Sequence, residues 1–274
     1  MKNIKKISIL TLVLALLLGT LAACGGGSSS GEDKTIKVAA TASPHAEVLE
    51  VIKDNLAEEG WELDIQVFDD YVQPNVATTT GDVDANYFQH INYLNDYNEE
   101  NGTELVAVGD VHYEPFGIYK GTKDSLDALE AGDKVGVPND ATNEKRALDL
   151  LAANGLITLK EGLGSEATVA DIVDNPKGLE IVEIEAATIP GTLPDLALGL
   201  INFNYAQGAG LTADDAIAYE AQDSDAIDGY VNVIVVNAGN ENSEKTKALV
   251  AAIQTDEVRQ FIEEKYNGLV KVRF

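Results

Sequence analysis

Residues 134–155, with the sequence KVGVPNDATNEKRALDLLAANG, decide the fold class of this 274-residue chain. The segment opens with an apolar run that predicts a buried β-strand, and residues 142–153 then follow a helical pattern. Asp140 or Thr142 can cap the first turn of this helix, and Gly155 follows it as a typical C-terminal cap. A strand, a polar loop and a helix in this order form the repeating unit of an α/β protein.

Strand-like and helical segments alternate along the rest of the chain as well. Strands are predicted at residues 35–40, 63–68, 105–108, 179–184, 198–203 and 231–236, and helices at 45–59, 93–98, 243–254 and 256–266. We therefore expect an α/β fold with largely parallel sheets. In such sheets, ligands bind beyond the carboxyl ends of the strands. Polar or aromatic residues occupy four places of this kind, at residues 41–45, 69–75, 138–146 and 202–205.

The N-terminus has the pattern of a secretory signal peptide. Three lysines precede an apolar run at residues 7–18, and Leu21-Ala22-Ala23-Cys24 follows it. The run is shorter than the roughly 20 residues that a transmembrane helix needs. The last four residues resemble a bacterial lipobox, which predicts cleavage after residue 23 and lipid attachment to Cys24. The alternative is an ordinary cleavage site beside an unmodified thiol.

The composition after the signal segment limits the possible partners. Residues 25–33, GGGSSSGED, contain too little apolar surface to order themselves and predict a flexible tether. A single cysteine excludes an intrachain disulfide and a cysteine-based metal cluster. The formal net charge of −27 argues against a nucleic-acid partner, because phosphate backbones require clustered lysine and arginine. We interpret the acidity as a solvated surface that keeps the protein in solution.

No catalytic pattern is present in the sequence. His45, His90 and His112 do not show the H-E-x-x-H spacing of a zinc site. A G-x-S-x-G elbow and a G-x-x-x-x-G-K phosphate loop are also missing. We therefore predict that the chain is not an enzyme and that it has no catalytic residue, no metal and no cofactor.

Several polar and aromatic residues are candidates for binding a ligand. In an extended segment, Phe88 and His90 share a face, so a ring and an imidazole would point the same way. The alternative is a core phenylalanine beside a hydrogen-bonded histidine. Tyr71 and Tyr230 are further aromatic candidates near strand ends, where packing is the more common role of such rings.

A second group of candidates could bind a carboxylate. Asn143 and Arg146 lie three residues apart on one helical face, near the N-terminus of the predicted helix. A guanidinium at that position can hold a carboxylate with two parallel hydrogen bonds. Alternatively, Arg146 could pair with Glu144 or Asp149 on the surface. Asn202 follows an apolar strand, where its amide could bind a ligand or only form a turn.

Five longer motifs resemble a known family. They are DYVQPN at residues 70–75, GDVDANYFQH at 81–90, PNDATN at 138–143, GLI at 155–157 and INFNYA at 201–206. In these motifs, and along residues 36–274, the chain resembles the NlpA or MetQ-type methionine-binding lipoproteins, the substrate-binding components of methionine ABC importers.

The resemblance implies a two-lobed α/β fold of the periplasmic-binding-protein type II, with two crossovers near residues 113–119 and 229–231. The implied divisions are a signal peptide at 1–23, a lipidated tether at 24–34, a first lobe at 35–114 and 231–274, and a second lobe at 115–230. A ligand would be enclosed between the two lobes.

The resemblance also implies roles for the candidate residues. Tyr71, Phe88 and His90 match positions that wall the side-chain pocket, whereas Asn143, Arg146 and Asn202 match those that hold the amino-acid backbone. Tyr230 completes the expected set of ligand-binding residues. The chain departs from the usual pattern at Lys145, where glycine is common, and at Phe203.

The expected ligand is methionine, as the L- or D-isomer, with a methionine-containing dipeptide or another small amino acid as alternatives. The implied partners are an ABC permease and its ATPase subunit, and the lipid on Cys24 would hold the protein at the extracytoplasmic face of the membrane. Two other kinds of protein remain possible on sequence grounds. One is a lipid-anchored enzyme on the same scaffold, and the other is an adhesin with a vestigial cleft.

Overall fold

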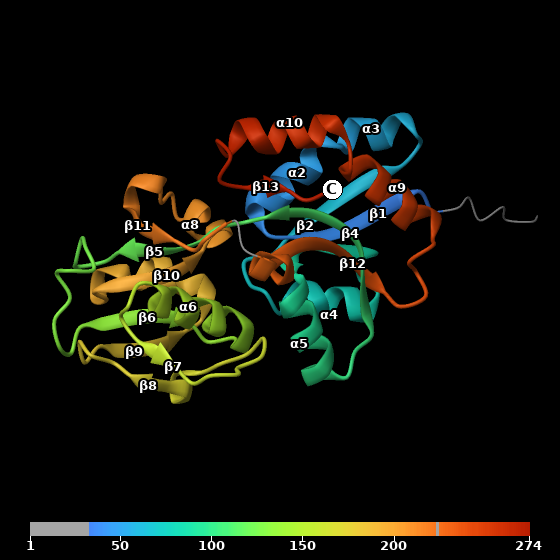
Figure 1. Ribbon diagram of the computed structural model, residues 1–274. Helices are drawn as coiled ribbons and strands as arrows, with labels where there is room; N and C mark the ends of the chain where they lie inside the picture. The colour runs from blue at the N-terminus through green and yellow to red at the C-terminus, as the bar shows by residue number, and fades with distance from the viewer. Residues whose placement is uncertain (1–32, 223–224) are drawn as a thin grey trace, which may run out of the picture. The chain divides into compact units, whose positions relative to one another are not determined.

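Two large β-sheets organise the folded unit Lys34–Phe274 in the computed structural model (Figure 1). The structure describes residues 33–222 and 225–274. The predicted signal peptide, Cys24 and residues 24–32 of the predicted tether lie outside the described residues. Among the helices of the described residues, none is long and apolar enough to span a membrane.

The first sheet has the strand order β13-β4-β12-β3-β1-β2. Its strands are β1 (Thr35–Ala40), β2 (Glu62–Val67), β3 (Ala85–His90), β4 (Leu105–Tyr113), β12 (Val231–Asn237) and β13 (Lys271–Val272). β1 pairs in parallel with β2 and β3, whereas β12 runs antiparallel to both β3 and β4. The sheet is therefore mixed and not largely parallel as expected, because a late strand of the chain is inserted between two early ones.

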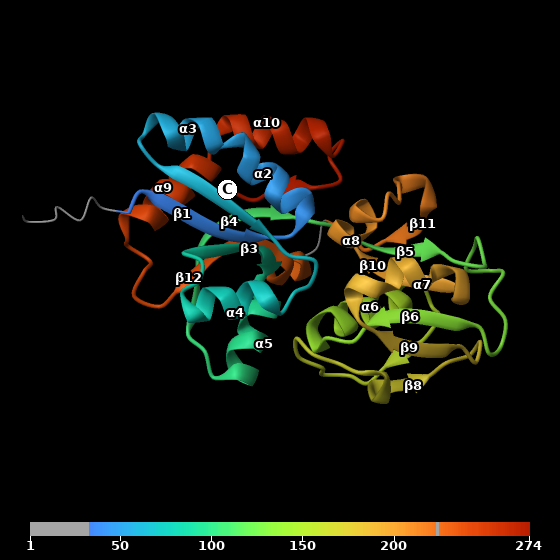
Figure 2. The same ribbon diagram turned by 180° about the vertical axis from the view of Figure 1, so that it is seen from behind.

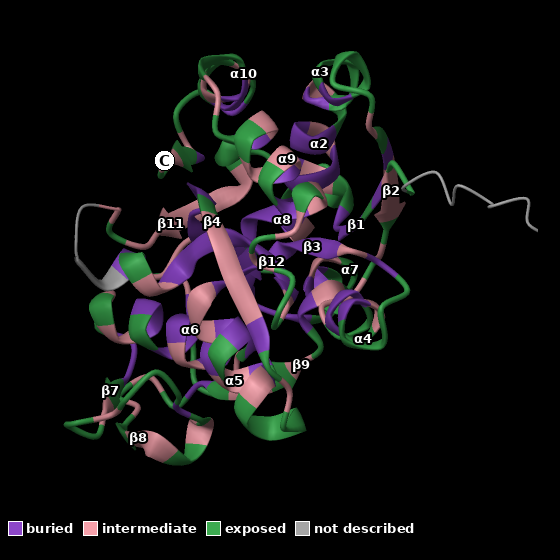
Figure 3. Cartoon of the chain, turned by 90° about the vertical axis from the view of Figure 1, so that its right-hand side faces the viewer, coloured by how far each residue is buried: buried purple, intermediate pink, exposed green. Residues whose placement is uncertain are grey.

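Helices cover both faces of the first sheet (Figures 1 and 2). One face carries α2 (Glu47–Val51), α3 (Lys53–Glu58), α9 (Glu244–Ile253) and α10 (Asp256–Lys265), and the other carries α4 (Gln73–Thr80) and α5 (Ile91–Asn101). Figure 3 shows α3 and α10 with exposed outer turns, whereas β3 and β12 are buried. The predicted helix at 45–59 is interrupted at Ile52, so α2 and α3 are separate.

The second sheet has the order β11-β5-β10-β6-β9 and is also mixed. Its strands are β5 (Phe116–Lys120), β6 (Lys134–Pro138), β9 (Glu180–Ile184), β10 (Leu198–Asn202) and β11 (Ala216–Tyr219). The segment first identified in the sequence folds as β6 and α6 (Ala141–Ala153), and Leu148 and Leu151 of that helix are fully buried beside Val135 and Leu200. Burial of each such side chain contributes roughly 1.5–3 kcal/mol.

Shorter elements complete the second sheet's surroundings. They are α7 (Ile189–Thr192), α8 (Phe203–Gly208), the two-stranded sheet of β7 (Thr158–Leu159) and β8 (Ile172–Asp174), and the short helical turns Val169–Asp171, Ala186–Thr188, Leu193–Asp195, Ala213–Asp215 and Asp225–Tyr230. A further irregular turn, Ala42–Ala46, precedes α2.

The chain passes between the two sheets twice. β4 ends at Tyr113 in the first sheet, and β5 begins at Phe116 in the second. β11 ends at Tyr219 in the second sheet, and β12 begins at Val231 in the first. The continuous ribbon from β4 to β5 is visible in Figure 1. The carboxyl ends of β3 and β10 and the start of α6 contribute to one pocket beside the first crossover.

Gly121→Ala is expected to destabilise the fold. An added methyl group would lie 2.3 Å from the carbonyl oxygen of Leu196 and 2.8 Å from that of Ala197, and these backbone atoms cannot move independently. We expect the free energy of unfolding, measured with urea, to fall by about 1–3 kcal/mol. Gly164→Ala is the control, because its methyl group would meet no atom within 4 Å. Equal stabilities of the two variants would show that Gly121 is not required by packing.

Candidate functional site

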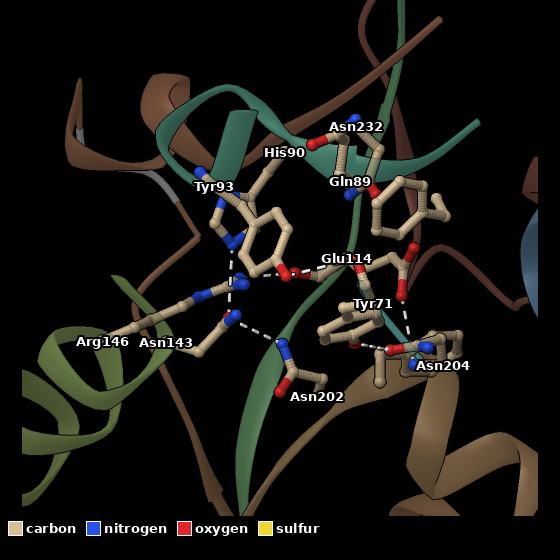
Figure 4. Close-up of a pocket in the computed structure, with 12 residues that line it drawn as sticks. Tyr71, Gln89, His90, Tyr93, Glu114, Asn143, Arg146, Asn202, Asn204 and Asn232 are labelled. Carbon is tan, nitrogen blue, oxygen red and sulfur yellow. Dashed lines mark hydrogen bonds between the residues drawn. The ribbon is translucent and has the colours of Figure 1, made fainter. Parts of the chain in front are cut away.

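One pocket gathers polar and aromatic side chains from both sheets (Figure 4). It surrounds about 340 Å³ of space not filled by protein atoms, including space that is open to solvent. The residues that line it are Tyr71, Phe88, Gln89, His90, Tyr93, Glu114, Asn143, Arg146, Asn202, Phe203, Asn204 and Asn232.

His90 ends β3 and caps the N-terminus of α5. Its Nδ1 accepts a hydrogen bond from the backbone N–H of Tyr93 at 3.1 Å, and its Nε2 lies 3.2 Å from Oδ1 of Asn143. This arrangement fits the neutral tautomer with the proton on Nε2. Burial, together with the positive charge of Arg146, lowers the pKa of His90 to about 3. The imidazole is therefore an uncharged part of the pocket wall at neutral pH.

Aromatic rings form one side of the pocket. The ring of Tyr71 lies 5.9 Å from that of Phe88, 5.8 Å from that of Tyr93 and 4.7 Å from that of Tyr205. The Tyr71 hydroxyl donates to Oδ1 of Asn204 at 2.6 Å. Burial raises the pKa of Tyr71, so this hydroxyl keeps its proton. Tyr71 therefore links the loop before α4 to α8, which follows the second sheet's β10.

Asn143 connects three elements at the polar end of the pocket. The Asp140 side chain caps α6 by accepting from the backbone N–H of Asn143 at 3.0 Å and from its Nδ2 at 2.8 Å. Those contacts fix the amide orientation, so that Oδ1 of Asn143 faces His90 and accepts from Nδ2 of Asn202 at 2.8 Å. Oδ1 of Asn202 is buried and has no hydrogen-bond partner within residues 33–222 and 225–274. An acceptor in this state favours a ligand that brings a donor.

Arg146 is held by the first crossover and by the end of β11. Its Nη2 donates to the carbonyl oxygen of Glu114 at 2.7 Å, and its Nε lies 2.9 Å and 3.1 Å from the two oxygens of Glu220. Nη2 also bonds to Glu220. Although burial alone lowers the pKa of Arg146, the Glu220 carboxylate outweighs it and raises the pKa. Surface pairing of Arg146 with Glu144 or Asp149 is therefore wrong.

Glu114, in the crossover between β4 and β5, supplies a buried carboxylate. Its Oε1 lies 2.8 Å from Nε2 of His112 and 3.2 Å from Nε2 of His45, and its Oε2 accepts from the backbone N–H of Asn204 at 3.1 Å. Burial alone raises the pKa of Glu114, but the charge interaction with His45 and the hydrogen bonds from His112 and His45 outweigh burial and hold the pKa well below its usual range. The carboxylate is therefore ionised.

His45, His112 and Glu114 also offer a donor set that could hold a metal ion. One ligand atom from each lies within 4.8 Å of the others. However, the two Nε2 atoms are hydrogen-bonded to Glu114, and the Nδ1 atoms contact the hydroxyls of Thr41 and Tyr87. Both imidazoles thus already have partners at each nitrogen. We interpret the three residues as a hydrogen-bonded network that supports the Glu114 carboxylate.

The structure brings most of the predicted site residues into this pocket. Tyr71, Phe88, His90, Asn143, Arg146 and Asn202 line it. Tyr230 is not among the lining residues. Its ring instead lies 4.3 Å from the guanidinium carbon of Arg146 and 5.0 Å from the ring of His90.

Sequence reasoning missed half of the lining residues, namely Gln89, Tyr93, Glu114, Phe203, Asn204 and Asn232. For Glu114 a signal existed. It is an acidic residue between Tyr113 and Pro115, within the predicted crossover. A carboxylate is rarely buried without a partner, so its position between the two predicted lobes indicates a polar site. For Asn232, within β12, the sequence offered no comparable signal, because its neighbours read as an ordinary buried strand.

The lowered pKa of His90 predicts a pH dependence of stability. The pKa of His90 is about 3 in the folded chain and lies below the ordinary 6.5. Between these pH values, His90 binds a proton in the unfolded chain but not in the folded one. The free energy of unfolding should therefore fall as the pH drops from 6.5 toward 3, by up to about 1.4 kcal/mol per pH unit from this group. His90→Asn keeps a helix cap and does not titrate, so its stability in urea should fall less steeply. Identical slopes for variant and parent would contradict the prediction.

Comparison with known proteins supports one assignment. The sequence profile described as NlpA lipoprotein matches residues 36–274. The D-methionine-binding lipoprotein MetQ of Escherichia coli is 42% identical over 257 residues, which cover 92% of this chain and 93% of that relative. The crystal structure of a lipoprotein from Ruminococcus gnavus is 56% identical, with a TM-score of 0.86 over 88% of this chain and 100% of that one.

A nutrient binding protein from Burkholderia cenocepacia, solved bound to methionine, is 42% identical, with a TM-score of 0.82 over 87% of this chain and 100% of its own. These similarities confirm the predicted two-lobed α/β fold with two crossovers. The family profile covers nearly all of the described residues, and the relatives align with this chain over most of their own lengths. The chain belongs to the NlpA lipoprotein family.

Proposed function

We propose that this protein is the lipid-anchored substrate-binding component of an ABC importer and that it captures methionine. The observation that carries the proposal is a pocket with a buried carboxylate and a buried guanidinium, Glu114 and Arg146, beside a wall of aromatic rings. A zwitterionic amino acid with an apolar side chain matches that arrangement. The names of the relatives reported above, which refer to methionine, support this ligand.

We assign the two charged ends of the amino acid to opposite partners. The ligand carboxylate accepts from Arg146, and the ammonium donates to Glu114 and to the unpaired Oδ1 of Asn202. An ammonium brings three donors, which suits a carboxylate and an amide oxygen together. Burying the ligand charges without such partners would cost several kcal/mol.

The aromatic wall receives the methionine side chain in this proposal. Tyr71, Phe88 and Tyr93 surround the apolar part of the pocket, and His90 adds an uncharged ring. Each buried methylene contributes about 0.8 kcal/mol. A sulfur atom near these rings adds roughly 0.3–1.5 kcal/mol. Tyr230 contributes indirectly, by packing against Arg146.

The proposal includes the division of the chain. Residues 35–114 with 231–274 form one lobe and residues 115–230 the other, and the lobes close on the ligand around the two crossovers. Tyr71 and His90 then come from the first lobe, whereas Asn143, Arg146 and Asn202 come from the second. Their hydrogen bonds across the pocket, Tyr71 to Asn204 and His90 to Asn143, are contacts that closure forms.

We also propose that the protein transports its ligand without transforming it. The two histidines that contact Glu114, His45 and His112, are 1% and 0% exposed and are bonded at both nitrogens. Neither is available to exchange protons with a ligand. The partners are an ABC permease with its ATPase subunit, to which the closed protein delivers methionine.

Arg146→Ala tests the assignment of the carboxylate. Loss of a buried partner charge costs about 3–5 kcal/mol, so methionine affinity measured by isothermal titration calorimetry should fall at least about 100-fold. Lys145→Ala is the matched control, because this neighbouring cation pairs with Asp149 and does not line the pocket. The control should bind as the parent does. Affinity of Arg146→Ala within a few-fold of the parent would remove Arg146 from the ligand site.

Cys24→Ser tests the membrane anchor. We expect the parent protein in membrane fractions and the variant in the soluble extracytoplasmic fraction, because one serine cannot carry a thioether-linked lipid. Membrane retention of the variant to the same extent as the parent would show that Cys24 is not the anchor. Methionine binding by the released variant should be unchanged, since residue 24 precedes the folded unit.

A further inference from the structure

Glu220 places a second carboxylate directly behind the guanidinium of the pocket. It follows β11, and its side chain is 14% exposed, against 5% for Arg146. Both of its oxygens contact Nε of Arg146, and Oε1 also bonds to Nη2. The same carboxylate accepts from the backbone N–H of Phe116 at 3.0 Å and from the Tyr113 hydroxyl. Glu220 therefore neutralises Arg146 and fixes it to the crossover.

The ion pair of Arg146 and Glu220 changes the net charge around a bound ligand. Glu114 and Glu220 contribute two negative charges, and Arg146 contributes one positive charge. His90 is neutral because its pKa is about 3. The imidazoles of His45 and His112 both lie against Oε1 of Glu114, at 3.2 Å and 2.8 Å. Glu114, Glu220 and Arg146 taken by themselves therefore sum to one negative unit.

The carboxylate and the ammonium of a bound amino acid therefore differ in how strongly the site attracts them. Arg146 still offers hydrogen-bond donors to a carboxylate, but Glu220 repels that carboxylate and offsets part of the attraction from the guanidinium. The described hydrogen-bond partners of Glu114 are two imidazoles and a backbone N–H, with no arginine or lysine among them. An ammonium beside it gains the full attraction of an ionised, buried carboxylate.

We propose that Glu220 is a specificity-determining residue that makes recognition depend mainly on the ligand ammonium, so that the site binds amine-only analogues and rejects carboxylate-only analogues. Glu220 acts through Arg146 and does not line the pocket, so it is a positioning residue. This inference rests on the proposed capture of methionine, and it adds which charged end of the ligand dominates its affinity.

Two analogues that each lack one charged group test the proposal. Removing the carboxylate from methionine gives 3-(methylthio)propylamine, and removing the amine gives 4-(methylthio)butanoate. We would measure the affinities of both, and of methionine, for the purified protein by calorimetry at pH 8. We expect the amine to bind at least about tenfold more tightly than the acid. An acid that binds as tightly as the amine, or more tightly, overturns the proposal.

Glu220→Gln separates the charge of Glu220 from its hydrogen bonds. The amide oxygen can still accept from Phe116 and Arg146, and Nη2 of Arg146 keeps its bond to the carbonyl oxygen of Glu114. With the negative charge gone, the amine-to-acid affinity ratio should fall at least about tenfold. A variant that only loosened the crossover would weaken both analogues alike and leave the ratio unchanged, which contradicts the proposal.

Two controls complete the experiment. Glu161→Gln makes the same charge change at an exposed position outside the pocket lining and should leave the ratio as in the parent. Glu220→Asp retains the charge and should retain the preference for the amine. If Glu220→Gln fails to fold, the amine-to-acid affinity ratios of the parent and of Glu220→Asp test the proposal. A preference for the amine in both supports it, and its absence in either contradicts it. Failure of the parent to bind methionine would refute the proposed function, whereas methionine binding with a preference for the acid refutes only this inference.

Discussion

The contact between Arg146 and Glu220 is the interaction on which the site depends. A guanidinium that is 5% exposed needs its charge balanced, and the nearest carboxylate lies 74 residues away in sequence. That carboxylate also holds Phe116 and Tyr113, the residues at either end of the first crossover. One ion pair therefore fixes the pocket's cation and the path of the chain between the sheets. Loss of either partner would leave a buried charge alone, which is far more costly than loss of an exposed pair.

The rest of the pocket follows from the need to give every buried polar group a partner. Glu114 is ionised because two imidazoles and a backbone N–H surround it. Asn143 is oriented by Asp140 and in turn orients Asn202. The exception is Oδ1 of Asn202, which none of the described residues satisfies. Among the described residues, this amide oxygen is the buried side-chain acceptor that a donor of the ligand could satisfy.

Local features of the fold were predictable from the sequence, whereas long-range pairings were not. The strand and helix of residues 134–155, with Asp140 as the cap, follow from spacing and capping chemistry, and both are present. The insertion of β12 between β3 and β4 depends on contacts across more than 100 residues, so the expectation of largely parallel sheets was wrong. Periodicity likewise could not locate the break at Ile52, because this residue fits the apolar stripe on either side.

The candidate site divides in the same way. Phe88, His90, Asn143 and Arg146 stand at strand ends or a helix start, which is where sequence reasoning places ligands. Glu220 could not be recognised, because its importance comes only from being opposite Arg146 in space, in a chain with 46 acidic residues. Tyr230 is a residue that the sequence suggested for the site but that does not line the pocket. It lies near a strand end as expected, but it packs behind the guanidinium.

His90 has two structural roles, and together they limit which substitutions at this position could adapt the pocket to another ligand. Its imidazole is both a wall of the cavity and the cap of α5, so a replacement that suits another cargo must also satisfy the Tyr93 backbone. Phe88, two residues earlier, contributes a ring to the same cavity, and its phenyl group carries no hydrogen-bond donor or acceptor that a helix cap could need. Evolution or protein engineering can therefore resize the cavity at position 88 while helix α5 keeps its start.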